Sequence, residues 1–131
     1  MALLLDTTVL IDALRGRPAA QRVRELRDAG QVSWICAVNV DEVIRGTSRD
    51  DDEEALAVRF LGGFRLAPLG QAEGERAGRW RRGYAGNGIT LSQADCLIAA
   101  SAVGVGARLA TGNPKHFPMP ELEVEHWPVG E

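Results

Sequence analysis

The sequence has few cysteines and no long apolar segment. Its two cysteines, Cys36 and Cys96, form neither a Cys-x-x-Cys pair nor a disulfide framework, so we expect a protein of the reducing cytosol. No apolar run approaches the roughly 18 residues that a membrane span requires. Asp6 interrupts the apolar start of the chain too early for a signal peptide. These absences predict a cytoplasmic protein that makes no contact with a membrane.

The chain also lacks an excess of positive charge. It has 15 lysine and arginine residues against 18 aspartate and glutamate residues, which gives a net charge of −3. Proteins that coat nucleic acid nonspecifically are normally basic, so a general packaging role is excluded. A nuclease is not excluded, because its metal site itself concentrates carboxylates. Any surface that binds a nucleic-acid strand would then be local.

Apolar and amphipathic segments alternate along the chain, and its 131 residues fit a single domain, 1–131. Strands are expected at 2–5, 32–37, 64–69, 108–110 and 123–126, and helices at 7–14, 19–29, 39–45, about 54–61, 71–84 and 92–103. This alternation predicts an α/β three-layer sandwich, a mostly parallel sheet of about five strands flanked by helices. In such sheets the functional residues gather at the carboxyl ends of the strands.

Three acidic residues stand out by their position. Asp6 directly follows the first expected strand, Glu42 follows the potential helix cap Asn39 by three residues, and Asp95 follows Ser92 in the same way. Carboxylates at strand ends and helix starts can face one crevice. A site built only from carboxylates suits Mg²⁺ or Mn²⁺, which can activate a water and neutralise charge on a phosphate.

Each acid also has a purely structural interpretation. The pairs Asn39–Glu42 and Ser92–Asp95 match the capping box, in which the acid stabilises a helix start. Asp6 is harder to explain in this way, although it too can cap the helix that begins at Thr7. From the residues alone, cap and metal ligand therefore remain alternatives.

Four segments, taken in order, resemble the motifs of PIN domains. They are residues 3–11 (LLLDTTVLI), 39–46 (NVDEVIRG), 91–100 (LSQADCLIAA) and 109–117 (LATGNPKHF). Their order and spacing fit the VapC branch of toxins, and the resemblance spans nearly the whole chain. It implies a PIN-like fold and a Mg²⁺- or Mn²⁺-dependent endoribonuclease that cuts structured RNA such as transfer or ribosomal RNA. It also implies a small VapB-like antitoxin as partner, and a homodimer.

The resemblance assigns roles residue by residue. It makes Asp6, Glu42 and Asp95 the metal-binding carboxylates, and it places Asn113 at a fourth catalytic position that is commonly Asp in the wider family. A neutral amide is a weaker ligand than a carboxylate, so the choice between one and two metal ions stays open.

Other side chains have an expected supporting or structural role. Thr7 and Thr111 are expected to support the site by hydrogen bonding, with helix capping as the alternative for Thr7. His116 is expected to fix its loop rather than to act as a base. The arginine-rich helix at 71–84 is interpreted as a solvated face with Trp80 turned inward, in preference to a phosphate-binding stripe.

Two other functions compete with RNA cleavage. A haloacid-dehalogenase-like phosphatase also begins with a strand that ends in Asp, but it needs a second Asp two residues later, where this chain has Thr8. The other alternative is a non-catalytic PIN-like module that binds RNA or a partner, and Asn113 is its only support. Metal-dependent cleavage by the purified protein distinguishes this module from the nuclease.

Overall fold

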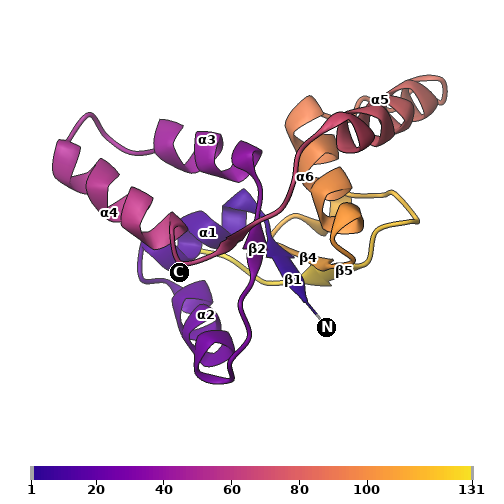
Figure 1. Cartoon of the computed structure of the whole chain (residues 1–131). Helices are drawn as coiled ribbons and strands as arrows, with labels where there is room; N and C mark the ends of the chain where they lie inside the picture. Colours follow the sequence, from indigo (N-terminus) through magenta and orange to yellow (C-terminus); the bar gives the residue numbers. More distant parts are fainter. Residues whose placement is uncertain (1, 131) are drawn as a thin grey trace.

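A five-stranded parallel sheet forms the centre of the protein (Figure 1). The computed structural model describes residues 2–130, and the strand order is β3-β2-β1-β4-β5 with every pairing parallel. The strands are β1 Leu3–Leu5, β2 Trp34–Ile35, β3 Arg65–Leu66, β4 Arg108–Thr111 and β5 Val124–His126. Because all strands run the same way, their carboxyl ends meet at one edge of the sheet.

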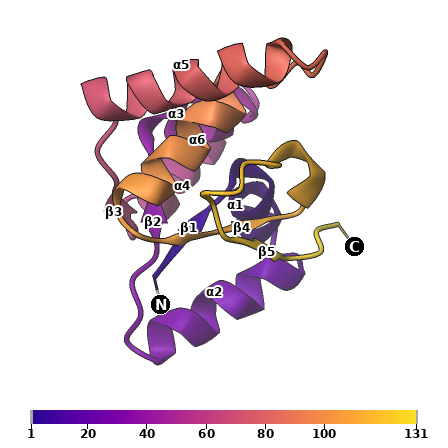
Figure 2. The ribbon, with the colours of Figure 1, turned by 90° about the vertical axis from the view of Figure 1, so that its right-hand side faces the viewer.

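Helices cover both faces of this sheet. They are α1 Thr7–Leu14, α2 Pro18–Asp28, α3 Ala37–Arg45, α4 Asp51–Leu61, α5 Gln71–Ala85 and α6 Gln93–Gly104, with a short 3₁₀ turn η1 at Pro114–His116. One apolar core joins the sheet to α5 and α6, and a second joins it to α1, α2 and α4. Figure 2 shows α5 and α6 on one side of the sheet and α2 on the other. The predicted three-layer α/β sandwich is confirmed.

Two strands are shorter than the apolar pattern predicts. The segments 32–37 and 64–69 were expected to be strands, yet the two segments pair only through Trp34 with Arg65 and Ile35 with Leu66. Helix α3 already begins at Ala37, which ends β2, and Val32 lies exposed before it. An apolar run indicates which residues are buried, but the length of the partner strand determines how many of them form strand hydrogen bonds.

The start of α3 also corrects the expected cap. The N-cap residue is Cys36, and Asn39 lies inside the helix, where its Oδ1 accepts a hydrogen bond of 2.8 Å from the Cys36 N–H. The capping interpretation of Glu42 is therefore wrong, because the helix begins two residues before Asn39. The expected Ser92 cap is confirmed, since its Oγ accepts a 3.0 Å hydrogen bond from the Asp95 N–H.

The arginine-rich helix α5 has the orientation that the sequence favours. Trp80 is buried, and its indole N–H donates a 2.6 Å hydrogen bond to Oε2 of Glu121. Arg79 lies on the exposed face with its ion-pair partner Glu75. None of the helices within residues 2–130 is both long and apolar enough to cross a membrane.

A buried carboxylate joins three parts of the chain. Asp12 on α1 accepts a 2.9 Å hydrogen bond from the N–H of Ala19, in the first turn of α2, and a 2.8 Å hydrogen bond from the N–H of Gly130. Asp12→Ala leaves both donors without this acceptor, so we expect the free energy of unfolding in urea to fall by about 2–4 kcal/mol. The exposed Asp41→Ala is the control and should change it by less than about 0.5 kcal/mol. Equal effects of the two variants would contradict this role.

Candidate active site

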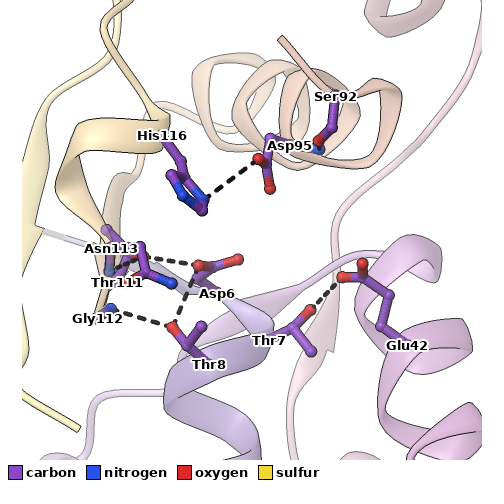
Figure 3. A network of polar contacts seen from close by, with 10 residues as sticks. All are labelled: Asp6, Thr7, Thr8, Glu42, Ser92, Asp95, Thr111, Gly112, Asn113 and His116. Carbon is purple, nitrogen blue, oxygen red and sulfur yellow. Dashed lines mark hydrogen bonds and ion pairs between the residues drawn. The ribbon is translucent and has the colours of Figure 1, made fainter.

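Asp6 lies at the carboxyl end of the central strand. It follows β1 directly, and its N–H extends the pairing with β4 through a 2.8 Å hydrogen bond to the Ala110 carbonyl. Only 4% of Asp6 is exposed. Its Oδ2 accepts hydrogen bonds from the hydroxyls of Thr111, at 2.6 Å, and Thr8, at 3.2 Å (Figure 3). Asp6 occupies the N-cap position of α1, but its side chain makes no capping hydrogen bond to that helix.

Both hydroxyls are themselves oriented by the loop that follows β4. The Gly112 N–H donates to Thr8 Oγ1 and the Asn113 N–H donates to Thr111 Oγ1, each at 3.0 Å. Each hydroxyl accepts from a backbone N–H, and its single proton is therefore directed to Asp6. The backbone of this loop thus fixes the orientation of the Asp6 carboxylate.

Glu42 reaches the same region from the middle of α3. Its Oε1 accepts a 2.6 Å hydrogen bond from the hydroxyl of Thr7, in the first turn of α1. The Thr7 oxygen in turn accepts a 3.1 Å hydrogen bond from Nδ2 of Asn39. Thr7 was expected to support the site by hydrogen bonding, and Glu42 is the residue that it contacts. The fully buried Asn39 orients the Thr7 hydroxyl.

Asp95 lies in the first turn of α6, across the crevice from Asp6 (Figure 3). Its side chain is 26% exposed. Oδ2 of Asp95 is 3.7 Å from Nδ1 of His116, which belongs to the 3₁₀ turn after β4. Three separate parts of the chain therefore contribute carboxylates to one edge of the sheet.

The carboxylates influence one another electrostatically. Burial raises the pKa of Asp6 above its ordinary value, the hydrogen bond from Thr111 opposes this shift, and the charge of Asp95 adds to it. Burial likewise raises the pKa of Asp95, and the charge of Glu42 adds to the shift. Desolvation and mutual repulsion both disfavour the ionised forms, as expected where buried carboxylates gather.

The donor set fits a hydrated hard cation. Within residues 2–130, no group of three or more His, Cys, Asp or Glu side chains is close enough to hold an ion directly. Mg²⁺ usually keeps several waters and takes one or two carboxylates, so it does not require such a group. Asp6, Glu42 and Asp95, together with the hydroxyls around them, offer oxygen atoms only, which is the chemistry that Mg²⁺ and Mn²⁺ prefer.

Asn113 occupies the N-cap position of η1 without capping it. Its side chain makes no capping hydrogen bond, so the amide is not engaged in stabilising the turn at Pro114. The residue is exposed, and its backbone contacts the same Thr111 hydroxyl that holds Asp6. The catalytic role expected for the Asn113 side chain therefore stays a prediction.

Sequence reasoning missed two side chains of this region. The sequence pattern marked Thr8 only as the place where a phosphatase needs Asp, and it predicted that His116 fixes its loop. Thr8 follows Asp6 by two residues in the first turn of α1, and His116 follows the strand that neighbours β1, so both positions carried a signal. Asp41, the neighbour of Glu42 on α3, is exposed.

Comparisons with known proteins identify the family to which the chain belongs. A sequence profile of the PIN domain matches residues 3–119. Ribonuclease VapC19 of Mycobacterium tuberculosis is 33% identical over 122 residues, which cover 92% of this chain and 96% of that protein. Ribonuclease VapC10 of the same organism is 36% identical over 118 residues, which cover 89% of this chain and 86% of that protein.

A solved structure shares the fold over the same extent. The crystal structure of VapBC2 from Rickettsia felis, bound to a promoter DNA fragment, matches with a TM-score of 0.84 at 22% identity. The match covers 97% of this chain and 99% of that chain. The chain therefore belongs to the PIN-domain family and, within it, is a homologue of the VapC ribonucleases.

The raised pKa values predict a stability cost at neutral pH. An acid whose pKa is higher in the folded state binds its proton more tightly there, so stability falls as pH rises from about 4, the ordinary Asp pKa, through the folded value. Asp6→Asn and Asp95→Asn are expected to melt above the wild type at neutral pH without divalent ions. The difference should shrink near pH 4, in thermal melts followed by circular dichroism, and Asp41→Asn serves as control. A lower melting temperature for both site variants at neutral pH would disprove the repulsion.

The loop at Gly112 leaves no room for a side chain. A Cβ there would lie 2.6 Å from Cγ2 of Val129 and 3.3 Å from the Thr8 hydroxyl that contacts Asp6. Gly112→Ala is expected to destabilise the protein by about 1–3 kcal/mol in urea unfolding, as overpacking does. Because Val129→Ala removes both clashing methyl groups, it should restore most of the loss in the double variant. If the free-energy changes of the two single variants simply add in the double variant, the predicted clash between Gly112→Ala and Val129 is wrong.

Proposed function

We propose that this protein is a divalent-metal-dependent endoribonuclease that acts as the toxin of a toxin–antitoxin pair in the cytoplasm. The observation that carries the proposal is the meeting of Asp6, Glu42 and Asp95, from β1, α3 and α6, at the carboxyl edge of the sheet. The two relatives that match most of the chain are named ribonucleases, which supports RNA as the substrate.

Asp6, Asp95 and Glu42 would hold Mg²⁺ or Mn²⁺, directly or through water, with Asn113 as a weaker fourth catalytic ligand. When bound, the ion supplies an activated water and neutralises the charge that develops on the phosphate. The site binds one ion in this proposal, because the neutral amide of Asn113 offers little attraction to a second.

The chain's own residues supply orientation and charge. The hydroxyls of Thr111 and Thr8 hold the Asp6 carboxylate in one orientation, and the hydroxyl of Thr7 does the same for Glu42. Catalytic groups that are fixed in advance lose little entropy in the reaction. The repulsion among the three carboxylates favours a cation between them and opposes the approach of a phosphate without one.

The substrate in this proposal is a single-stranded stretch of structured RNA, such as transfer or ribosomal RNA. A net charge of −3 does not favour RNA over the whole surface, so cations beside the site must hold the strand. Lys115, exposed in the turn that also carries His116, is placed for this role.

The partner in this proposal is a VapB-like antitoxin, and the toxin forms a homodimer. A solved structure from Klebsiella pneumoniae that shares the fold, with a TM-score of 0.74 at 27% identity over 92% of this chain and 95% of that chain, is named a toxin–antitoxin complex, which supports an antitoxin as partner. An apolar groove of about 150 Å³ lies between α1, α3 and α4, with Ile11, Val43 and Leu56 in its lining. Leu56 is 61% exposed, so this groove is available to an apolar segment of the partner.

Cleavage of one RNA by purified variants tests the proposed function. Asp6→Ala, Glu42→Ala and Asp95→Ala should each lower kcat/KM about 100-fold or more, because each weakens the hold on the ion. Asn113→Ala should lose only about tenfold, as a supporting group does. Removal of divalent ions with a chelator should abolish cleavage, and re-addition of Mg²⁺ or Mn²⁺ should restore it.

Asp41→Ala is the matched control and should cleave like the wild type. Full activity of any one carboxylate variant would remove that residue from the site. An absence of cleavage by the wild type with either metal would instead favour a non-catalytic module that binds RNA or a partner.

A further inference from the structure

A hollow of about 460 Å³ lies directly beside Asp95. The loop before α6 forms one wall, and the turn η1 together with Pro118 forms the other. Its lining includes Ile89, Thr90 and Leu91 on the first side and Lys115, His116 and Pro118 on the second. The hollow is distinct from the carboxylate cluster, but it shares Asp95 with it.

The lining of the hollow combines apolar, aromatic and polar side chains. Ile89 is 45% exposed and therefore offers apolar surface to solvent. His116 has a planar ring whose side chain is 60% exposed. Thr90 is exposed. Its hydroxyl forms no hydrogen bond with another residue of the described range 2–130. An apolar surface, a planar ring and a free hydroxyl suit a nucleobase, which stacks on its faces and hydrogen-bonds at its edge.

Lys115 adds a positive charge at the same place. No carboxylate within residues 2–130 forms an ion pair with its ammonium group, unlike Arg79 and Arg108 elsewhere on the surface. A lysine that forms no such ion pair can bind an incoming anion, such as a phosphate. A base surface and a phosphate-binding cation therefore occur together in one hollow.

The hollow adjoins the acidic site, and this position indicates which ligand it binds. His116 lines the hollow and also lies 3.7 Å from Asp95, so it marks the boundary between the two. A strand whose phosphodiester lies at Asp6 and Asp95 must place a neighbouring nucleotide near this boundary. A free cofactor would need no such connection to the carboxylates.

We propose that this hollow binds the nucleotide next to the phosphodiester that is cut, and that it determines base preference there. Lys115 holds the phosphate of that nucleotide, His116 and Ile89 contact the faces of its base, and Thr90 hydrogen-bonds to its edge. The inference rests on the proposed function for its substrate, but binding of the nucleotide does not require cleavage.

The first experiment measures binding without cleavage. The full-length chain is titrated with each of the four ribonucleoside 5′-monophosphates in the absence of divalent ions, and amide chemical shifts are followed by NMR. We expect shifts at residues 89–92 and 115–118, with one nucleotide preferred. Lys115→Gln should weaken all four by a similar factor, because it removes a phosphate contact. Thr90→Val keeps the shape and removes the hydroxyl, so it should reduce the preference by roughly fivefold to tenfold.

The controls lie away from the hollow, and Arg24→Gln removes the same charge as Lys115→Gln. Arg24→Gln removes an exposed cation from α2, on the opposite face of the sheet, and Val32→Ala shortens an exposed apolar side chain before β2. Both should bind the nucleotides like the wild type. Shifts confined to other segments, or unchanged affinity and preference in Lys115→Gln and Thr90→Val, would overturn the proposal.

The second experiment uses an RNA library with randomised sequence, cleaved by the wild type and the same variants in Mg²⁺. The 5′ ends of the products give the base frequencies on each side of the cut. Thr90→Val should flatten the preference at one position only, whereas Lys115→Gln should slow cleavage of all sequences alike. A preference that Thr90→Val leaves unchanged would refute the specificity role. If the wild type binds the mononucleotides as expected but cuts no RNA, the proposed function fails and the nucleotide site stands.

Discussion

The burial of the Asp6 carboxylate constrains the elements that surround the candidate site. Asp6 ends the central strand in a position where only 4% of the residue reaches solvent, and burial of a charge is costly unless it is hydrogen-bonded. The hydroxyls of Thr111 and Thr8 provide those hydrogen bonds, and both are set by the backbone of the loop after β4. The neighbouring strand β4 and its loop therefore have to lie where they do for Asp6 to remain in the core.

The other carboxylates are arranged around this fixed point. Thr7 on α1 holds Glu42 of α3, and Ser92 begins the helix that presents Asp95. Since parallel strands deliver their carboxyl ends to one edge, the sheet brings these groups together from distant parts of the sequence. Burial, with a smaller contribution from mutual repulsion, raises the pKa values of Asp6 and Asp95, so the fold retains an arrangement that favours a bound cation.

The sequence by itself determined the fold class, the family and the candidate acids. Strands and helices alternate in its apolar pattern, and each motif is a short continuous segment, so local information sufficed to recognise them. It also gave the inward face of Trp80 and the Ser92 cap, because helical periodicity and capping depend on near neighbours.

Only the tertiary structure decided which acids are caps and which side chains share the site. Asn39 looked like a cap, but α3 begins at Ala37, and Glu42 meets Thr7 across 35 positions of sequence. The contact of Thr111 with Asp6 spans 105 positions. Contacts of this kind follow from the order of strands in the sheet. That order is set by the packing of the whole chain, which no local pattern encodes.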